Sequence, residues 1–166
     1  MDTPLPADVA KLLDSALTLA RETLAIGDEV PPTWYLMNRE IGSAIMVVAP
    51  FRNDDEKYAA AHKIRHTATL SGCDCVVFIC EGWAKPTLST DPDFERLSRT
   101  GNIRDEPDRI DVLMINVETY DGFWGAMPEV FAKGRRRELA AVEFERGEQM
   151  GAMSSWLPPR HDTTRH

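Results

Sequence analysis

The side chains that could do chemistry in this chain are scattered acids and histidines, because no complete catalytic motif is present. Glu81 and Trp83 directly follow an apolar run that is typical of a buried strand, and Glu118 lies near the end of a later one. If these strands are neighbours, Glu81 and Glu118 could converge as a carboxylate pair for acid–base or metal chemistry. The alternative is that Glu81 caps a turn or pairs with an arginine such as Arg109.

His62 and His66 are four residues apart on a predicted helix, a spacing that lets two imidazoles share one metal ion. Zinc proteases need a glutamate after the first histidine, and Lys63 stands there instead. Both histidines also face away from the apolar stripe that contains Ile64. We therefore interpret them as part of a solvated helix face and predict no metal site.

Other signatures of catalysis and of cofactor binding are missing. No serine lies in the Gly-x-Ser-x-Gly pattern of a nucleophile elbow, and the glycines are too scattered to form a phosphate-binding loop. Cys73, Cys75 and Cys80 are odd in number and close together, so they do not form a secreted disulfide framework. We interpret them as reduced core thiols of a cytosolic protein and predict no cofactor.

Charge and composition exclude several classes of partner. The 166 residues are 43% hydrophobic and 28% charged, as in a single globular domain, and the net charge is -8. A field of this sign disfavours non-specific binding to nucleic acid or to anionic lipid. The basic triplet 135–137 is interpreted as a solvated turn. Neither a secretory signal nor a membrane span is expected, and the predicted location is cytoplasmic.

Hydrophobic periodicity predicts an α+β fold, with two main helices on a six-stranded mixed sheet in which antiparallel pairing dominates. A strand–helix–strand crossover over 43–80 indicates that the strands around it run parallel. Residues 84–109 form a long connection that holds one short helix at 92–99. The predicted order is α-β-β-α-β-β-β-β, with helices at 6–25 and 53–70 and strands at 33–37, 43–49, 75–80, 111–119, 123–132 and 138–144.

Several local motifs resemble those of a large set of uncharacterised small bacterial and phage proteins. The resemblance covers about residues 30–145. It implies the topology and a bacterial or mobile-element setting, and it implies no activity. The motifs that carry it are Asp54-Asp55-Glu56-Lys57, Phe78-Ile79-Cys80-Glu81-Gly82-Trp83, Pro107-Asp108-Arg109 and Glu118-Thr119-Tyr120-Asp121-Gly122.

The last residues, 147–166, have little periodicity and are predicted to be a tail beyond a single domain over 1–146. Trp156 lies beside two prolines, which suits a peptide that docks on a partner. The alternative is that Trp156 folds back and fills a face of the sheet.

Two functions are compatible with these observations. The first is an acidic binding or regulatory protein that acts through a protein partner or self-association, with Trp83, Arg109 and Trp156 as binding residues. The second is a small enzyme with Glu81, Glu118 and one of the histidines around a cleft at the strand ends. A cluster of Glu81 with a second acid or a histidine in a concave pocket would favour the enzyme.

Overall fold

An antiparallel sheet organises the fold of this chain. The computed structural model describes residues 4–100, 103–147 and 155–160, and it confirms the α+β class. The main sheet has the strand order β2-β1-β3-β4-β5-β8, and β6 pairs only with β7. The elements are α1 (Ala7–Ala25), β1 (Thr33–Asn38), β2 (Ser43–Val48), α2 (Asp54–Ser71), β3 (Cys75–Ala84), α3 (Pro92–Thr100), β4 (Ile110–Thr119), β5 (Gly122–Ala126), β6 (Val130–Lys133), β7 (Arg136–Leu139) and β8 (Glu145–Gly147).

Local sequence signals determine the ends of α2. The side chain of Asn53 accepts a hydrogen bond of 2.9 Å from the amide of Glu56. The carboxylate of Glu56 accepts one of 2.6 Å from the amide of Arg52. The first bond satisfies an amide that the first helical turn leaves unpaired, and the second satisfies the amide of the residue before the N-cap. Gly72 ends the helix with a φ of 62°, a left-handed conformation that suits glycine.

Every neighbouring pair of strands in the main sheet is antiparallel, so the expected mixed sheet is corrected. The chain does cross over from β2 through α2 to β3, and β2 and β3 run in the same direction. However, β1 lies between them and is antiparallel to both. The crossover prediction therefore gave the relative direction of these strands but not their neighbours.

The three strands predicted at 111–119, 123–132 and 138–144 are also different in the structure. The expected strand 123–132 is broken at Pro128, which has no amide to donate to a ladder and instead accepts from the amide of Leu113 at 3.0 Å. The chain then forms the β6–β7 hairpin, whose turn contains Gly134 at a φ of 63°. Only β8 returns to the main sheet, beside β5.

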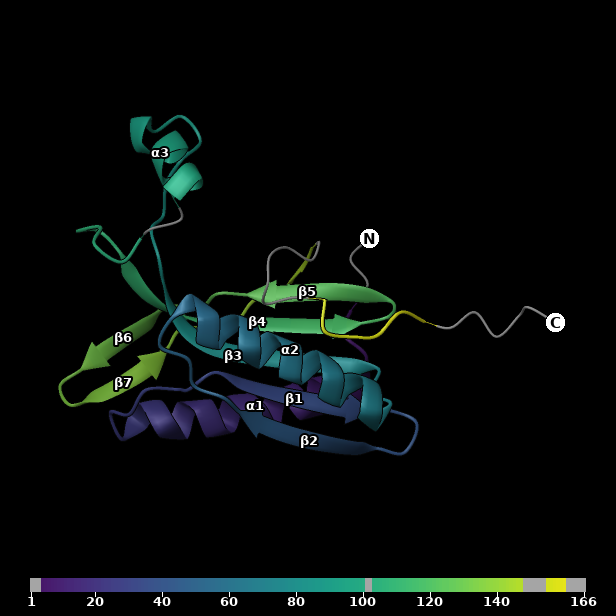
Figure 1. Ribbon diagram of the computed structural model, residues 1–166. Helices are drawn as coiled ribbons and strands as arrows, with labels where there is room; N and C mark the ends of the chain where they lie inside the picture. Colours follow the sequence, from purple (N-terminus) through teal and green to yellow (C-terminus); the bar gives the residue numbers. More distant parts are fainter. Residues whose placement is uncertain (1–3, 101–102, 148–154, 161–166) are drawn as a thin grey trace.

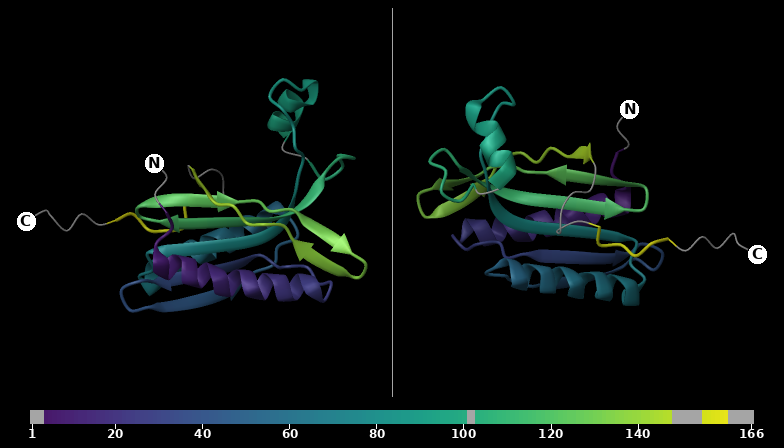
Figure 2. Two further views of the ribbon diagram at one scale, coloured as in Figure 1. Left: turned by 180° about the vertical axis from the view of Figure 1, so that it is seen from behind. Right: turned by 45° about the horizontal axis from the view of Figure 1, so that its top comes forward.

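The two main helices cover opposite faces of the sheet (Figures 1 and 2). Alternate residues of each strand point to opposite faces, so β3 contributes Val77 and Ile79 to the core under α1 and Val76 and Phe78 to the core under α2. In α1 the buried positions include Leu17, whereas Leu19 is exposed.

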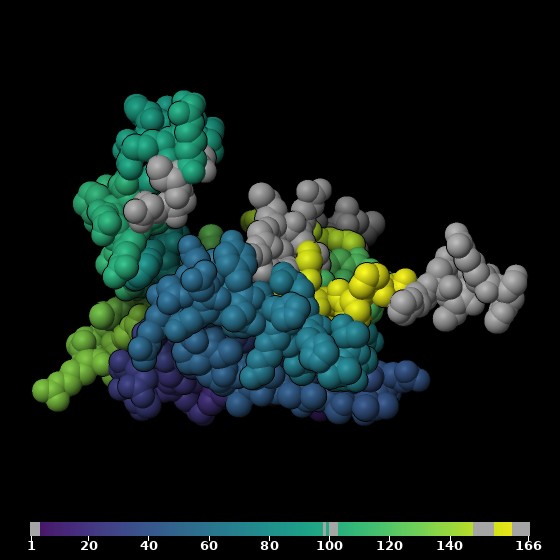
Figure 3. Space-filling model, in the orientation of Figure 1, coloured from purple at the N-terminus to yellow at the C-terminus, as the bar shows by residue number. Residues whose placement is uncertain are grey.

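The connection between β3 and β4 stands away from this body as an arm, defined here as residues 85–109, that carries α3 at its end (Figures 1 and 3). An ion-pair cluster links α3 to residues near the two chain ends of the arm. Glu106 accepts a hydrogen bond of 2.9 Å from Lys85 and lies 2.8 Å from Arg96 of α3. These cations lower the pKa of the Glu106 carboxyl.

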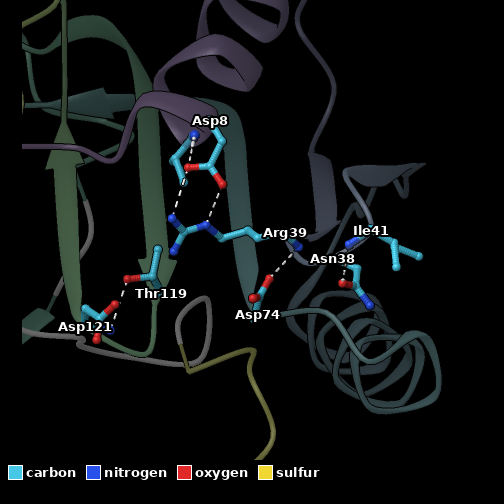
Figure 4. A network of polar contacts seen from close by, with 8 residues as sticks. Asp8, Asn38, Arg39, Ile41, Asp74, Thr119 and Asp121 are labelled. Carbon is cyan, nitrogen blue, oxygen red and sulfur yellow. Dashed lines mark hydrogen bonds and ion pairs between the residues drawn. The ribbon is translucent and has the colours of Figure 1, made fainter.

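A second polar cluster ties the start of α1 to the sheet (Figure 4). The guanidinium of Arg39 donates to both carboxylate oxygens of Asp8, at 2.7 and 3.0 Å, and the amide of Arg39 donates to Asp74 at 2.8 Å. The hydrogen bond from Arg39 lowers the pKa of Asp8, so the pair stays ionised in mildly acidic conditions. Through Arg39, the start of α1 and the residue before β3 are thereby fixed relative to each other.

Candidate functional site

A cleft of about 320 Å³ lies where the end of β3 and the start of β4 meet the loop after α1 and strand β7. Three acids, one arginine and one tryptophan line it together with two glycines. These elements come from distant parts of the sequence, and the antiparallel β3–β4 register places Trp83 opposite Asp111. The lining side chains are Glu29, Glu81, Trp83, Asp111 and Arg137.

Glu81 is the buried anchor of this cleft. One carboxylate oxygen accepts a hydrogen bond of 2.8 Å from the amide of Val30, and the other lies 2.5 Å from Nη2 of Arg137. The second contact is an ion pair without hydrogen-bond geometry. Of the expected alternatives for Glu81, pairing with an arginine is the one observed, but the partner is Arg137 rather than Arg109. Glu81 therefore holds the α1–β1 loop and β7 against β3.

Trp83 and Arg109 form the outer part of the site. The Trp83 side chain is 45% exposed, and the guanidinium carbon of Arg109 lies 4.8 Å from the centre of its ring. This arrangement is a cation–π contact, worth roughly 0.5–1 kcal/mol at exposed positions. The structure thus brings together two of the three binding residues expected from the sequence, at the base of the arm.

The acids that line the cleft outnumber its arginine. Arg137 is already paired with Glu81, whereas neither Glu29 nor Asp111 forms an ion pair with any residue that the structure describes. Both of these residues are solvent-exposed and line the same cleft as Trp83, and Asp111 is opposite Trp83 in the β3–β4 register. Carboxylates beside an exposed aromatic ring attract an organic cation, because charge attraction and the ring quadrupole act in the same direction.

Glu118 does not belong to this site, so the expected carboxylate pair is not formed. Glu118 is opposite Val76 in the β3–β4 register, five positions from Glu81, which is roughly 17 Å along the strand. The alternation of the strands also puts the two acids on opposite faces of the sheet. The two strands are neighbours, as the prediction supposed, but their antiparallel pairing places the ends that carry the two acids at opposite edges of the sheet.

Glu118 instead receives the C-terminal segment 155–160. Its buried carboxylate accepts hydrogen bonds from the amides of Trp156, at 2.7 Å, and Leu157, at 3.3 Å. The hydroxyl of Tyr120 donates to the carbonyl of Pro158 at 2.7 Å. These bonds fix an irregular backbone segment on the sheet.

Trp156 is part of the core under α2 and is 2% exposed. Its ring centre lies 5.8 Å from that of Trp34 and 5.9 Å from that of Phe78, and the Arg65 guanidinium lies 5.0 Å from it. Of the two alternatives for Trp156, packing on the sheet is the one observed. The predicted tail is corrected for residues 155–160, because a buried indole is not available to a partner; the rest of 148–166 lies outside the described residues.

His62 and His66 lie exposed on the outer face of α2, as expected. Within the parts of the chain that the structure describes, no three side chains of histidine, cysteine or acid type are grouped as a metal site would require. The two histidines are also on the face of α2 turned away from the sheet and are not among the residues that line the cleft.

Burial should make the cysteines unreactive. It raises the pKa of Cys73 to about 11 and those of Cys75 and Cys80 to about 12. Since the thiolate is the nucleophile, we expect Cys75 and Cys80 to react slowly with a disulfide reagent at neutral pH and rapidly after denaturation. A time course of labelling in native and denatured protein measures this. Rapid stoichiometric labelling of both native thiols, or zinc found by elemental analysis, would contradict it.

Sequence reasoning missed Glu29, Asp111 and Arg137 as members of the site. Glu29 lies in a connection, Arg137 in the four-residue strand β7 and Asp111 at the start of β4, so no periodicity marks them. The one usable signal was the surplus of cations in the 135–137 turn, since a buried acid such as Glu81 needs a partner.

Comparison with protein-family models, with curated proteins and with solved structures finds no match to this chain. The resemblance to small bacterial and phage proteins therefore stays an expectation. No helix in the described ranges combines the length and the apolar character needed to cross a membrane.

Proposed function

We propose that this protein is a binding protein that captures a basic side chain of a partner polypeptide in the cleft at the base of the arm. The observation that carries the proposal is the exposed Trp83 ring in a cleft that Glu29 and Asp111 also line. The ring already holds one guanidinium, that of Arg109. A lysine or arginine from a partner would meet the same chemistry in the cleft.

The rigidity of the site supports this proposal. Glu81 is bonded to both Val30 and Arg137, so the walls of the cleft are fixed before a ligand arrives. The Lys85–Glu106–Arg96 cluster similarly fixes the base of the arm next to Trp83. A preformed site loses less conformational entropy on binding than a mobile one.

The geometry supports binding better than catalysis. The enzyme alternative placed Glu118 and a histidine beside Glu81, and these groups lie apart. Glu81 does share a cleft with two other acids, Glu29 and Asp111, which is the arrangement expected to favour an enzyme. Within the cleft, Glu81 is the acid nearest to complete burial, and its two oxygens are occupied by Val30 and Arg137. These contacts indicate that Glu81 positions the α1–β1 loop and β7 around the cleft.

The test is a fluorescence-anisotropy titration with a labelled arginine-rich peptide and an acidic peptide of equal length. We expect binding of the basic peptide only. Trp83→Ala and Asp111→Asn should each weaken binding by about tenfold, the equivalent of roughly 1.4 kcal/mol. Arg109→Ala should strengthen it, because the native guanidinium competes for the ring.

Matched controls lie elsewhere on the surface. Tyr58→Ala removes an exposed aromatic ring from α2, and Asp14→Asn removes an exposed carboxylate from α1. Both should leave the affinity unchanged. If Trp83→Ala binds the peptide as well as the wild type does, or if the controls lose as much affinity as the cleft variants, the proposed site is wrong.

A further inference from the structure

The outer edge of β2 is an uncharged strand edge that pairs with no other strand among the described residues. β2 pairs with β1 on one side only and is the end strand of the main sheet (Figure 1). From Ser43 to Val48 it has no charged residue and no proline, the devices that usually protect an edge from pairing. Its exposed apolar side chains are Ile45, Met46 and Val48, with Ile41 in the preceding turn.

We infer that β2 pairs with β2 of a second copy of this chain, antiparallel about a two-fold axis at Met46. The two main sheets would then form one continuous sheet across the dimer. This surface is separate from the Trp83 cleft, and the inference does not depend on the proposed function.

Backbone directions determine the register of this pairing. The amide of Ala49 donates to the carbonyl of Pro32 at 3.1 Å, so Ala49 points toward β1. Because successive residues of a strand alternate in direction, the amides and carbonyls of Ala44, Met46 and Val48 point outward. A two-fold axis at Met46 pairs it with itself and pairs Ala44 with Val48 of the other copy. These three pairs exchange about six hydrogen bonds.

The side chains of β2 are also compatible with this register. Ile45 faces Val47 of the other copy, and Met46 faces its own symmetry mate, so only apolar groups meet across the strands. No charged residue lies between Ser43 and Val48, so no like charges meet along the paired strands.

The opposite edge of the sheet explains why assembly should stop at two copies. β8 is short, and it presents the exposed charged residues Glu145 and Arg146. Such an edge resists pairing, whereas β2 on β2 is an isologous contact that closes on itself. A closed dimer, not a fibre, is expected.

The experiment is sedimentation velocity over the micromolar to millimolar range, on the full chain and on charged variants. Wild type should be a dimer that dissociates on dilution. Met46→Lys places two like charges on the axis and should give a monomer with an unchanged circular dichroism spectrum, because Met46 is 53% exposed. Leu70→Lys, at an exposed apolar position on α2, should remain a dimer.

One further measurement tests the register itself. Met46→Cys should be cross-linked between copies by a short bifunctional thiol reagent, and Leu70→Cys should not. The inference is overturned if wild type stays monomeric throughout, if it forms larger assemblies, if Met46→Lys still dimerises, or if Met46→Cys is not cross-linked.

Discussion

Replacing Trp156 with alanine should cost about 3–5 kcal/mol of folding free energy, the range for a large buried aromatic side chain. The indole fills the core between the sheet and α2, in contact with Trp34 and Phe78. For a chain of this size the loss corresponds to a fall in Tm of roughly 6–20 °C, at ~2–4 °C per kcal/mol. Thermal melting followed by circular dichroism measures it.

Two variants separate packing from other effects of this substitution. Trp83→Ala makes the same change at an exposed site and should cost under about 1 kcal/mol. Trp156→Phe keeps an aromatic ring, and the indole nitrogen that it removes has no hydrogen-bond partner among the described residues. It should therefore cost clearly less than Trp156→Ala. Equal melting of Trp156→Ala and wild type would show that the segment 155–160 is not part of the core.

The elements with short-range signals could be predicted from the sequence. Asn53 and Gly72 fix the two ends of α2 within a few residues of themselves, and the predicted helix ends within one residue of the observed one. The β1–β2 hairpin likewise follows from two apolar runs around a turn that contains Gly42. The interactions behind these predictions are local, so a linear pattern contains them.

The arrangement of the strands depends on long-range choices that no local pattern records. That β1 is inserted between β2 and β3 could not be determined from the apolar runs, which only mark strands. The antiparallel pairing of β4 with β3 is a second such choice, and it separates Glu81 from Glu118 and removes the expected carboxylate pair. The partner of Glu81, Arg137, was equally hidden, because tertiary packing of the β6–β7 hairpin brings it there.

The position of Trp156 shows why the sequence alone left two alternatives for this side chain. Its segment has no helical or strand periodicity, since an irregular backbone lies on the sheet there. What stabilises it is the buried carboxylate of Glu118, which accepts from two of its amides. A strand-end acid is common in sequences, and only the folded chain shows which backbone groups it satisfies.

The central strand gives the most direct test of the fold. Ile79 is 1% exposed in the core under α1, on β3 between β1 and β4. Ile79→Ala should cost about 2–5 kcal/mol, since it removes apolar contacts and leaves a cavity that the flanking strands hold open.

Denaturant unfolding measures this cost, and Ile26→Ala is the matched control. It removes the same atoms from a side chain that is 74% exposed at the end of α1, and it should cost under about 0.5 kcal/mol. Because the two substitutions are chemically identical, the difference between their unfolding midpoints isolates burial from any intrinsic effect of alanine. If the midpoints coincide, β3 is not the buried central strand, and the cleft that depends on the β3–β4 register is also in the wrong place.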